Sequence, residues 1–213
     1  MSDREIIDAV IIGAGISGMY QLHKLRDELG LDVKVFEAGS GVGGTWYWNR
    51  YPGARFDSES YSYGYSFSDE LLEEWNWNEH FSPQPDNLKY LEFVADKFNL
   101  RPNIEFNTRV LTAHYDNDRN LWRITTDGGQ STSCKFLISA VGVLSTPFVP
   151  AIPGLENFKK PSWHTAEPRG AWPQVRVRTL GMELHRLEDV EERAEAKVTP
   201  HRASRSRHYR RPN

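Results

Sequence analysis

Short apolar runs and one helical stretch alternate along the first 40 residues of the chain. Residues 10–12 form a continuous apolar run, which is typical of a strand buried on both faces. From Ile16 to Leu29 the apolar residues recur at helical spacing, and residues 32–37 return to a strand pattern. This order predicts a strand, a turn, a helix and a second strand parallel to the first.

Two more helices and a series of short strands are predicted in the rest of the chain. The helices are expected at residues 69–77 and 86–99, and Pro85 stands just before the second. Strand patterns separated by turn residues follow at residues 104–106, 110–116, 121–126, 130–134 and 136–140. The middle three predict a β-meander. An extended exit is marked by Pro147, Pro150 and Pro153.

Three glycines occupy the turn between the first predicted strand and its helix. Gly13, Gly15 and Gly18 fill all three positions of a GxGxxG pattern. In such a pattern the first glycine permits the tight turn, the second lets the backbone approach a pyrophosphate, and the third lets the helix pack closely. The phosphates then meet the helix N-terminus, where unpaired N–H groups and the dipole favour negative charge. The turn predicts a site for the ADP half of a dinucleotide, with a purely structural turn as the alternative.

An acid follows at the distance that such a site requires. Glu37 ends the second predicted strand, 19 positions after Gly18, where it can accept hydrogen bonds from ribose hydroxyls. A carboxylate at this position repels a 2′-phosphate. The first site is therefore predicted to bind FAD or NAD and not NADP.

A long loop, residues 38–67, combines paired glycines with a dense series of aromatic residues. It is too long for a simple connection. Gly43 and Gly44 stand where a backbone can lie against a ligand without side-chain interference. The aromatic residues of this loop have a second interpretation, which is ordinary packing in the core. The sequence leaves both interpretations open for Trp46, Tyr47, Trp48 and Tyr51.

Composition limits the class of protein. The chain has 213 residues and a mean hydropathy of -0.62, with no apolar run long enough to cross a bilayer. Cys134 is the only cysteine, so an internal disulfide is impossible, and we expect it to be a small apolar filler in a strand. The first ten residues carry acids where a signal peptide is basic and then apolar. We predict a cytoplasmic protein without a membrane partner or a metal site.

Charge divides the chain into two parts. Residues 1–167 carry 15 basic and 23 acidic side chains, whereas residues 168–213 carry 11 basic and 6 acidic ones. We therefore predict a dinucleotide-binding domain over residues 1–167 and a disordered or irregular arginine-rich tail over residues 168–213. A reading-frame change or unspliced sequence after Ala166 would explain such a tail. The alternative, that residues 201–211 bind nucleic acid or an anionic surface, is less typical of basic ends, and no nucleic-acid partner is expected.

Three motifs in a fixed order carry a resemblance to a known family. They are GAGISG at residues 13–18, GVGGTWYWNRYPGARFD at residues 41–57 and SAVGVLSTP at residues 139–147. From about Asp8 to His164 the chain resembles the N-terminal FAD-binding part of the flavin-dependent Baeyer–Villiger monooxygenases. The resemblance implies an α/β fold: a Rossmann-like FAD-binding domain of the GR2 type, with three layers (ββα) and an inserted β-meander.

The resemblance also implies cofactor contacts beyond the glycine turn. Gly44, Thr45 and Trp46 would line the flavin. Asp57 would lie beside it and hold a catalytic arginine in position, with a loop cap as the alternative role. Arg55 would border the nicotinamide. The remaining contacts with FAD would come from Ser58, Tyr63, Val110, Ala140 and Gly142, although Val141 replaces the family's threonine between the last two.

The activity implied by the resemblance is oxygen insertion into a ketone, which yields an ester or a lactone. FAD and NADPH would be the cofactors, and a small-molecule ketone and O₂ the substrates. The family's junction fingerprint, FxGxxxHxxxW, is half present, because Phe158 and His164 match whereas Lys160 and Pro168 do not. No GxGxxG follows His164. We therefore expect the NADP domain and the catalytic arginine to be missing, and the 213-residue chain to be incomplete as a catalyst.

Two other functions stay open at this point. The chain could act as a flavin-binding fragment without turnover, or it could be a relative of the flavin-containing monooxygenases that oxygenate nitrogen or sulfur. A yellow, flavin-containing protein would fit both of these functions as well as the Baeyer–Villiger reaction. Ester formation from a ketone would distinguish the Baeyer–Villiger reaction from the other two. The sequence identifies neither the substrate nor the oligomeric state.

Overall fold

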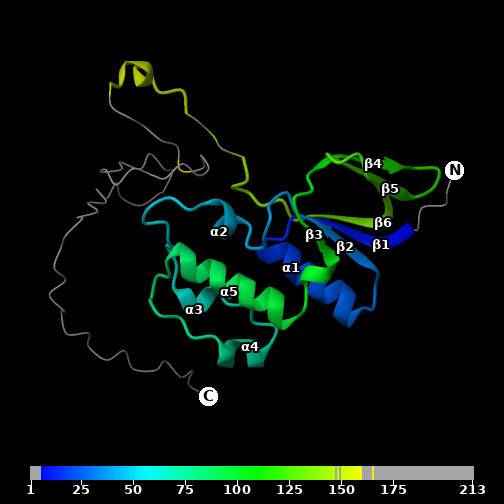
Figure 1. The fold of residues 1–213 in the computed structure, drawn as a ribbon, viewed down its shortest axis with the longest axis horizontal. Coiled ribbons are helices and arrows are strands. Elements are labelled where there is room, and N and C mark those ends of the chain that lie inside the picture. The colour runs from blue at the N-terminus through cyan, green and yellow to red at the C-terminus, as the bar shows by residue number, and fades with distance from the viewer. Residues whose placement is uncertain (1–5, 147, 149, 160–164, 166–213) are drawn as a thin grey trace.

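The computed structural model describes residues 6–146, 148, 150–159 and 165. Its strands are β1 (Ile6–Ile12), β2 (Val33–Phe36), β3 (Ile104–Glu105), β4 (Val110–Asp116), β5 (Leu121–Thr126) and β6 (Ser131–Ser139). They form one sheet in the order β3-β2-β1-β6-β5-β4 (Figure 1). The pairs β3-β2, β2-β1 and β1-β6 are parallel, and the pairs β6-β5 and β5-β4 are antiparallel. The sheet therefore combines a dinucleotide-type parallel half with a meander.

Helices cover one face of the parallel strands (Figure 1). They are α1 (Ile16–His23), α2 (Thr45–Trp48), α3 (Ser60–Tyr63), α4 (Asp69–Glu74) and α5 (Gln84–Lys97), with a π-helical turn at Lys24–Glu28 and 3₁₀ turns at Arg101–Asn103 and Leu155–Asn157. Met19 and Leu22 of α1 and Leu91 of α5 are buried against Ile11 of β1 and Val35 of β2. This apolar contact is the main core, and it fixes the turn between β1 and α1 against the sheet.

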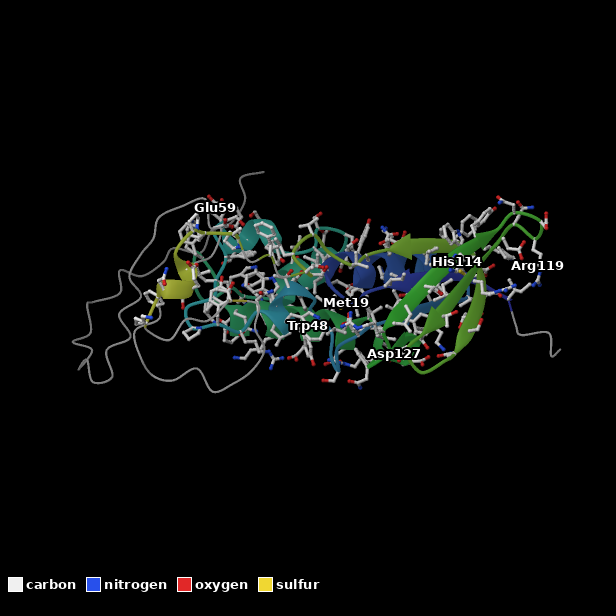
Figure 2. The ribbon with its side chains drawn as sticks, turned by 90° about the horizontal axis from the view of Figure 1, so that it is seen from above. Met19, Trp48, Glu59, His114, Arg119 and Asp127 are labelled. Atoms are coloured by element: carbon white, nitrogen blue, oxygen red, sulfur yellow. The ribbon has the colours of Figure 1, made fainter. Side chains whose placement is uncertain are left out.

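The meander covers the second face of the sheet. Val10 of β1 and Phe36 of β2 pack with Ile124 of β5 and Cys134 of β6 in a second buried cluster. Figure 2 shows His114 and Arg119 of this layer toward the opposite end of the described part from Glu59. The helices, the parallel strands and the meander make three layers, so the predicted α/β fold class is confirmed. Cys134 is fully buried, as expected of an apolar filler, and burial raises the pKa of its thiol.

The prediction of separate strands at residues 130–134 and 136–140 was wrong. A single strand, β6, runs from Ser131 to Ser139. It pairs with β5 over residues 131–134 and with β1 over residues 133–139. Lys135, the residue between the two predicted strands, is exposed, and its Nζ donates to Asp8 Oδ1 at 2.7 Å. Strand β6 therefore links the meander to the parallel strands. The charge of Lys135 is accommodated within it, because the side chain is paired with Asp8.

Several predicted boundaries also shift. α5 begins at Gln84, so Pro85 lies inside its first turn, where a missing N–H costs no helical hydrogen bond. α4 ends at Glu74 rather than at residue 77. The helix predicted to run from Ile16 to Leu29 becomes π-helical after His23. The boundary at residue 167, the fingerprint residues Lys160, His164 and Pro168, and the tail at residues 168–213 lie outside the described residues.

Asp8 provides a pH-dependent contribution to stability at the start of β1. Its carboxylate accepts from Lys135 Nζ at 2.7 Å and from the Asp32 N–H at 3.0 Å, and these bonds lower the pKa of Asp8 below its ordinary value of 3.8. Because the folded-state pKa is the lower one, the contribution is present above the unfolded pKa. It is lost as the pH falls through the folded pKa.

We expect Asp8→Asn to lower the melting temperature by about 1–3 °C at pH 7. The difference from the unmodified chain should shrink as the pH falls below about 4, because the native carboxylate is then protonated as well. Thermal melts followed by circular dichroism between pH 3 and pH 7 measure this. Asp118→Asn, in the exposed β4–β5 turn, is the control. An equal difference at both ends of the pH range would contradict the prediction.

Candidate functional site

The turn between β1 and α1 is packed against its own backbone. Gly13 has a φ of +102°, and its N–H donates to the Phe36 carbonyl at 2.8 Å. A Cβ at Gly13 would lie 2.6 Å from the carbonyl oxygen of Ala140. A Cβ at Gly18 would lie 1.9 Å from the carbonyl oxygen of Gly13. Both positions therefore exclude any side chain. The glycine at position 18 lets helix α1 pack directly against the turn that precedes it.

Gly15 lies against a second glycine-rich segment, the loop that follows β2. The Gly43 N–H donates to the Ala14 carbonyl at 3.0 Å. A Cβ on Gly15 would stand 3.3 Å from the Cα of Gly44, and a Cβ on Gly44 would stand 2.8 Å from the Cα of Gly15. Gly44 also has a φ of +52°, which L side chains rarely adopt. The structure thus brings together two glycine segments that the sequence analysis treated separately.

Glu37 holds both loops in place. It is 5% exposed, and its Oε2 accepts from the Ala14 N–H at 2.7 Å. Its Oε1 accepts from the Gly39 N–H at 2.7 Å. Because each carboxylate oxygen has two lone-pair sites, each retains one acceptor position for a further donor such as a ribose hydroxyl. The carboxylate therefore fixes the geometry of the turn and keeps capacity for a ligand.

Residues 107 and 108 pair with the backbone of Glu37 and Gly39, and of this segment the sequence predicted only Val110 as a site residue. The Thr108 N–H donates to the Glu37 carbonyl at 2.9 Å, and the Asn107 N–H donates to the Gly39 carbonyl at 2.9 Å. Val110 opens β4 and packs in the second cluster. The signal that could have revealed these contacts is the short parallel strand β3, which delivers the chain to the end of β2.

Trp46 is buried in an aromatic cluster. It is 8% exposed, and its Nε1–H donates to the Tyr63 hydroxyl at 2.8 Å. Its ring lies 5.3 Å from that of Phe56, and the Phe56 and Tyr63 rings are 3.9 Å apart. Burial raises the pKa of Tyr63. Trp46 is therefore packed as a core residue in this structure. Its neighbour Thr45 is exposed.

Asp57 is held on a segment that is fixed on its N-terminal side. Arg55 donates to Glu79 Oε2 at 3.1 Å and to the Phe81 carbonyl at 3.0 Å, and Phe56 is 6% exposed. Asp57 and Ser58 are exposed, and neither side chain has a hydrogen bond or ion pair with the described residues. The Asp57 carboxylate is therefore presented to solvent from an anchored backbone.

The end of β6 closes the other side of the glycine turn. The Ala140 N–H donates to the Ile12 carbonyl at 2.9 Å, and the Ala140 carbonyl faces Gly13. Gly142 has a φ of +76° and open space around it. Ala140 is thus brought to the turn, whereas Gly142 stands at the exposed start of the exit segment.

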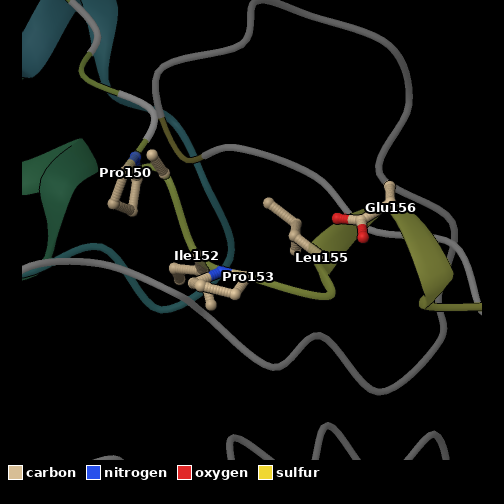
Figure 3. Close-up of a pocket in the computed structure, with 6 residues that line it drawn as sticks. Pro150, Ile152, Pro153, Leu155 and Glu156 are labelled. Atoms are coloured by element: carbon tan, nitrogen blue, oxygen red, sulfur yellow. The ribbon is translucent and has the colours of Figure 1, made fainter.

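Two hollows in the described part lie away from these residues. One, of about 600 Å³, is formed by the exit segment, whose Pro150, Ile152, Pro153, Leu155 and Glu156 are labelled in Figure 3. The other, of about 420 Å³, is lined by parts of α3 and α4 and by residues 75–80. Neither includes a glycine of the β1–α1 turn. The glycine turn that the sequence predicts to bind a dinucleotide is therefore separate from both hollows.

The described residues place no three His, Cys, Asp or Glu side chains so that they could hold a metal ion. Within the same residues, no helix has the length and apolar character needed to cross a membrane.

Known proteins share this arrangement. A family model of the NAD(P)-binding Rossmann-like domain matches residues 11–70. A Baeyer-Villiger monooxygenase of Pseudooceanicola batsensis is 47% identical over 167 residues, which are 78% of this chain and 30% of that protein. The phenazine N-monooxygenase PhzNO1 of Lysobacter antibioticus is 46% identical over 172 residues, which are 81% of this chain and 31% of that protein.

A solved structure agrees in fold as well as in sequence. The crystal structure of OTEMO in complex with FAD and NADP has a TM-score of 0.68 and 47% identity, over 75% of this chain and 30% of that chain. Over about four fifths of its length the chain is similar to Baeyer–Villiger monooxygenases. The resemblance that the three motifs carry is thereby confirmed. The chain spans about 30% of the length of the curated relatives it matches.

Proposed function

We propose that residues 1–167 bind FAD through its ADP half and supply the flavin site of an NADPH-using monooxygenase. The reaction would insert an atom of O₂ into a small-molecule ketone and yield an ester or a lactone. The observation that carries the proposal is the contact of the Glu37 carboxylate with the Ala14 N–H inside the turn formed by Gly13, Gly15 and Gly18. It supports a role for Glu37 as a ribose acceptor beside a phosphate-binding turn.

The N-terminus of α1 fits a pyrophosphate. Gly15, its N-cap, provides no side-chain cap, and the first turn of the helix holds no acid. The first N–H groups of the helix are therefore left for an external acceptor, and the helix dipole favours an anion there. The absence of a side chain at Gly15 leaves room for a phosphate to approach the backbone. These features support FAD as the bound group, with the adenosine ribose at Glu37 and the adenine near the backbone of Val110.

The remaining residues are proposed to act on the flavin side. Bound FAD would supply the redox chemistry, by taking a hydride from NADPH and reacting with O₂. Gly44, Thr45 and Trp46 would line the ring system, with Ser58, Tyr63, Ala140 and Gly142 as further contacts. Asp57 would hold a catalytic arginine by its carboxylate, and Arg55 would border the nicotinamide. The Asp57 carboxylate is exposed and has no partner among the described residues, which supports its part of this proposal.

Flavin titration tests the proposal. The purified chain should quench FAD fluorescence with a Kd in the micromolar range, and it should bind FMN and riboflavin at least about 100-fold more weakly, because both lack the ADP half. ADP should compete with FAD for the same site. Equal binding of FAD and FMN, or no binding of either, would contradict the assignment of the glycine turn.

The single buried, free cysteine agrees with a reducing cytoplasm as the proposed compartment.

Nitrogen oxygenation is the second candidate function. The 46% identity to the phenazine N-monooxygenase PhzNO1 favours it, because that relative matches as much of this chain as the Baeyer–Villiger enzymes do. Both reactions would use the same FAD site, so flavin binding does not separate them. The assay needs a catalytically active protein that contains this chain. It should be given a cyclic ketone and, separately, an N-heteroaromatic compound. Lactone from the first, without N-oxide from the second, would select the Baeyer–Villiger reaction.

A further inference from the structure

Tyr47 folds back from α2 onto the loop that follows β2, which we call the ribose loop and define as residues 38–44. Its ring covers the backbone of that loop. A Cβ at Gly39 would lie 2.6 Å from the Tyr47 ring, and one at Gly41 would lie 3.1 Å from it. A side chain at Gly39 would force the ring to move and one at Gly41 would crowd it, and the ring in turn limits the conformations open to the loop.

The Tyr47 hydroxyl closes the contact with two hydrogen bonds. It accepts from the Ser40 N–H at 3.0 Å and lies 2.7 Å from the Ser40 Oγ. Arg50 lies over the Tyr47 ring, with its Cζ 5.0 Å from the ring centroid, and its Nε–H donates to the Tyr47 carbonyl at 2.9 Å. The ring thus contacts both a cation and the ribose loop, and these contacts keep its hydroxyl directed at Ser40.

Gly39, the residue next to Ser40, connects the ribose loop to the Glu37 carboxylate. The Gly39 N–H donates to Glu37 Oε1 at 2.7 Å, while Glu37 Oε2 accepts from Ala14 in the glycine turn. A loop free to move at Ser40 would carry the Gly39 N–H away from Oε1. The carboxylate would then rotate, and its free lone pairs would no longer face one fixed point.

We propose that Tyr47 is a positioning residue, which fixes the ribose loop so that the Glu37 carboxylate receives the diol of the adenosine ribose. This inference rests on the proposed FAD function. It assigns Tyr47 neither to the flavin pocket nor to passive core packing, the two interpretations that the sequence left open. Tyr47 acts through Glu37 and does not touch the cofactor in this role, so its effect must depend on the ribose hydroxyls.

The test compares two variants with two ligands. The variants are Tyr47→Phe, which keeps the ring and removes the hydroxyl, and Tyr61→Phe, a control at a tyrosine that is 69% exposed and lies outside the ribose loop. The ligands are FAD and its 2′,3′-dideoxyadenosine analogue, which lacks the diol. Kd values come from fluorescence titration, and circular dichroism melts establish that each variant is folded.

Tyr47→Phe should weaken FAD binding about 5- to 10-fold and should change the Kd of the dideoxy analogue less than about 2-fold. Tyr61→Phe should leave both Kd values unchanged. Ser40→Ala, which removes only the Oγ partner, should give a smaller loss with the same dependence on the diol, and it serves if Tyr47→Phe does not fold. Equal losses for both ligands, or no loss with FAD, would overturn this role. Failure of the unmodified chain to bind FAD would instead overturn the proposed function, and this inference with it.

Discussion

Gly15→Val is expected to reduce FAD affinity at least about 100-fold, a loss of roughly 2.7 kcal/mol in binding free energy. The backbone of Gly15 has φ -79° and ψ -169°, so its conformation does not require glycine. The space at this position is tight, because the first carbon of any side chain would stand 3.3 Å from the Cα of Gly44. The two methyl groups of valine must then extend toward Gly44 or into the volume proposed for the pyrophosphate. In either case the phosphate loses its approach to the first N–H groups of α1.

The control for this variant is Gly128→Ala in the β5–β6 turn. A Cβ there meets nothing closer than 4.0 Å and needs no left-handed backbone. Both variants should give far-ultraviolet circular dichroism spectra like that of the unmodified chain, because neither changes the sheet. The affinity of Gly128→Ala for FAD should be unchanged. A Gly15→Val protein that binds FAD within about 3-fold of the unmodified chain would show that the turn is structural only.

Local patterns were sufficient to predict the elements of this fold where the deciding contacts are close in sequence. The bounds of β4 and β5 follow from alternating residues on either side of a short turn, whose Asn120 takes the positive φ that such turns need. The prediction splits β6 in two at Lys135, whose partner Asp8 lies 127 residues away. The sequence does not show that such a partner exists.

The candidate site was predictable in its turn but not in its loops. The βαβ order and the spacing to Glu37 are enough to place the glycine turn beside an acid. The path of residues 38–67 depends on contacts such as Trp46 with Tyr63 and Gly15 with Gly44, which no local pattern shows. The same loop explains why Trp46 and Tyr47 stayed ambiguous. Their neighbours come from other segments, so the sequence could not separate a ring in the core from one at a ligand.

A polypeptide of these 213 residues is expected not to oxygenate ketones. A hydride donor needs a pyrophosphate site of its own, and no GxGxxG occurs after His164. The carboxylate of Asp57 is exposed, and none of the described arginines pairs with it. Val143 is 98% exposed and Leu144 69% exposed beside the end of β6. The proposed flavin site would therefore be open to water, where electrostatic stabilisation of a developing charge is weak.

The measurement is to incubate the purified polypeptide with FAD, NADPH, O₂ and cyclohexanone, and to analyse the products by gas chromatography. No lactone should appear above the control without protein, and NADPH oxidation should stay at the rate of free FAD. Flavin reduced with dithionite and then exposed to O₂ should likewise give hydrogen peroxide and no lactone, because none of the described arginines pairs with Asp57 to stabilise negative charge at the reacting oxygen. Lactone in the second experiment alone would mean that only the NADPH site is lacking. Lactone in the first would mean that residues 168–213 complete the site despite their composition, and the prediction would be wrong.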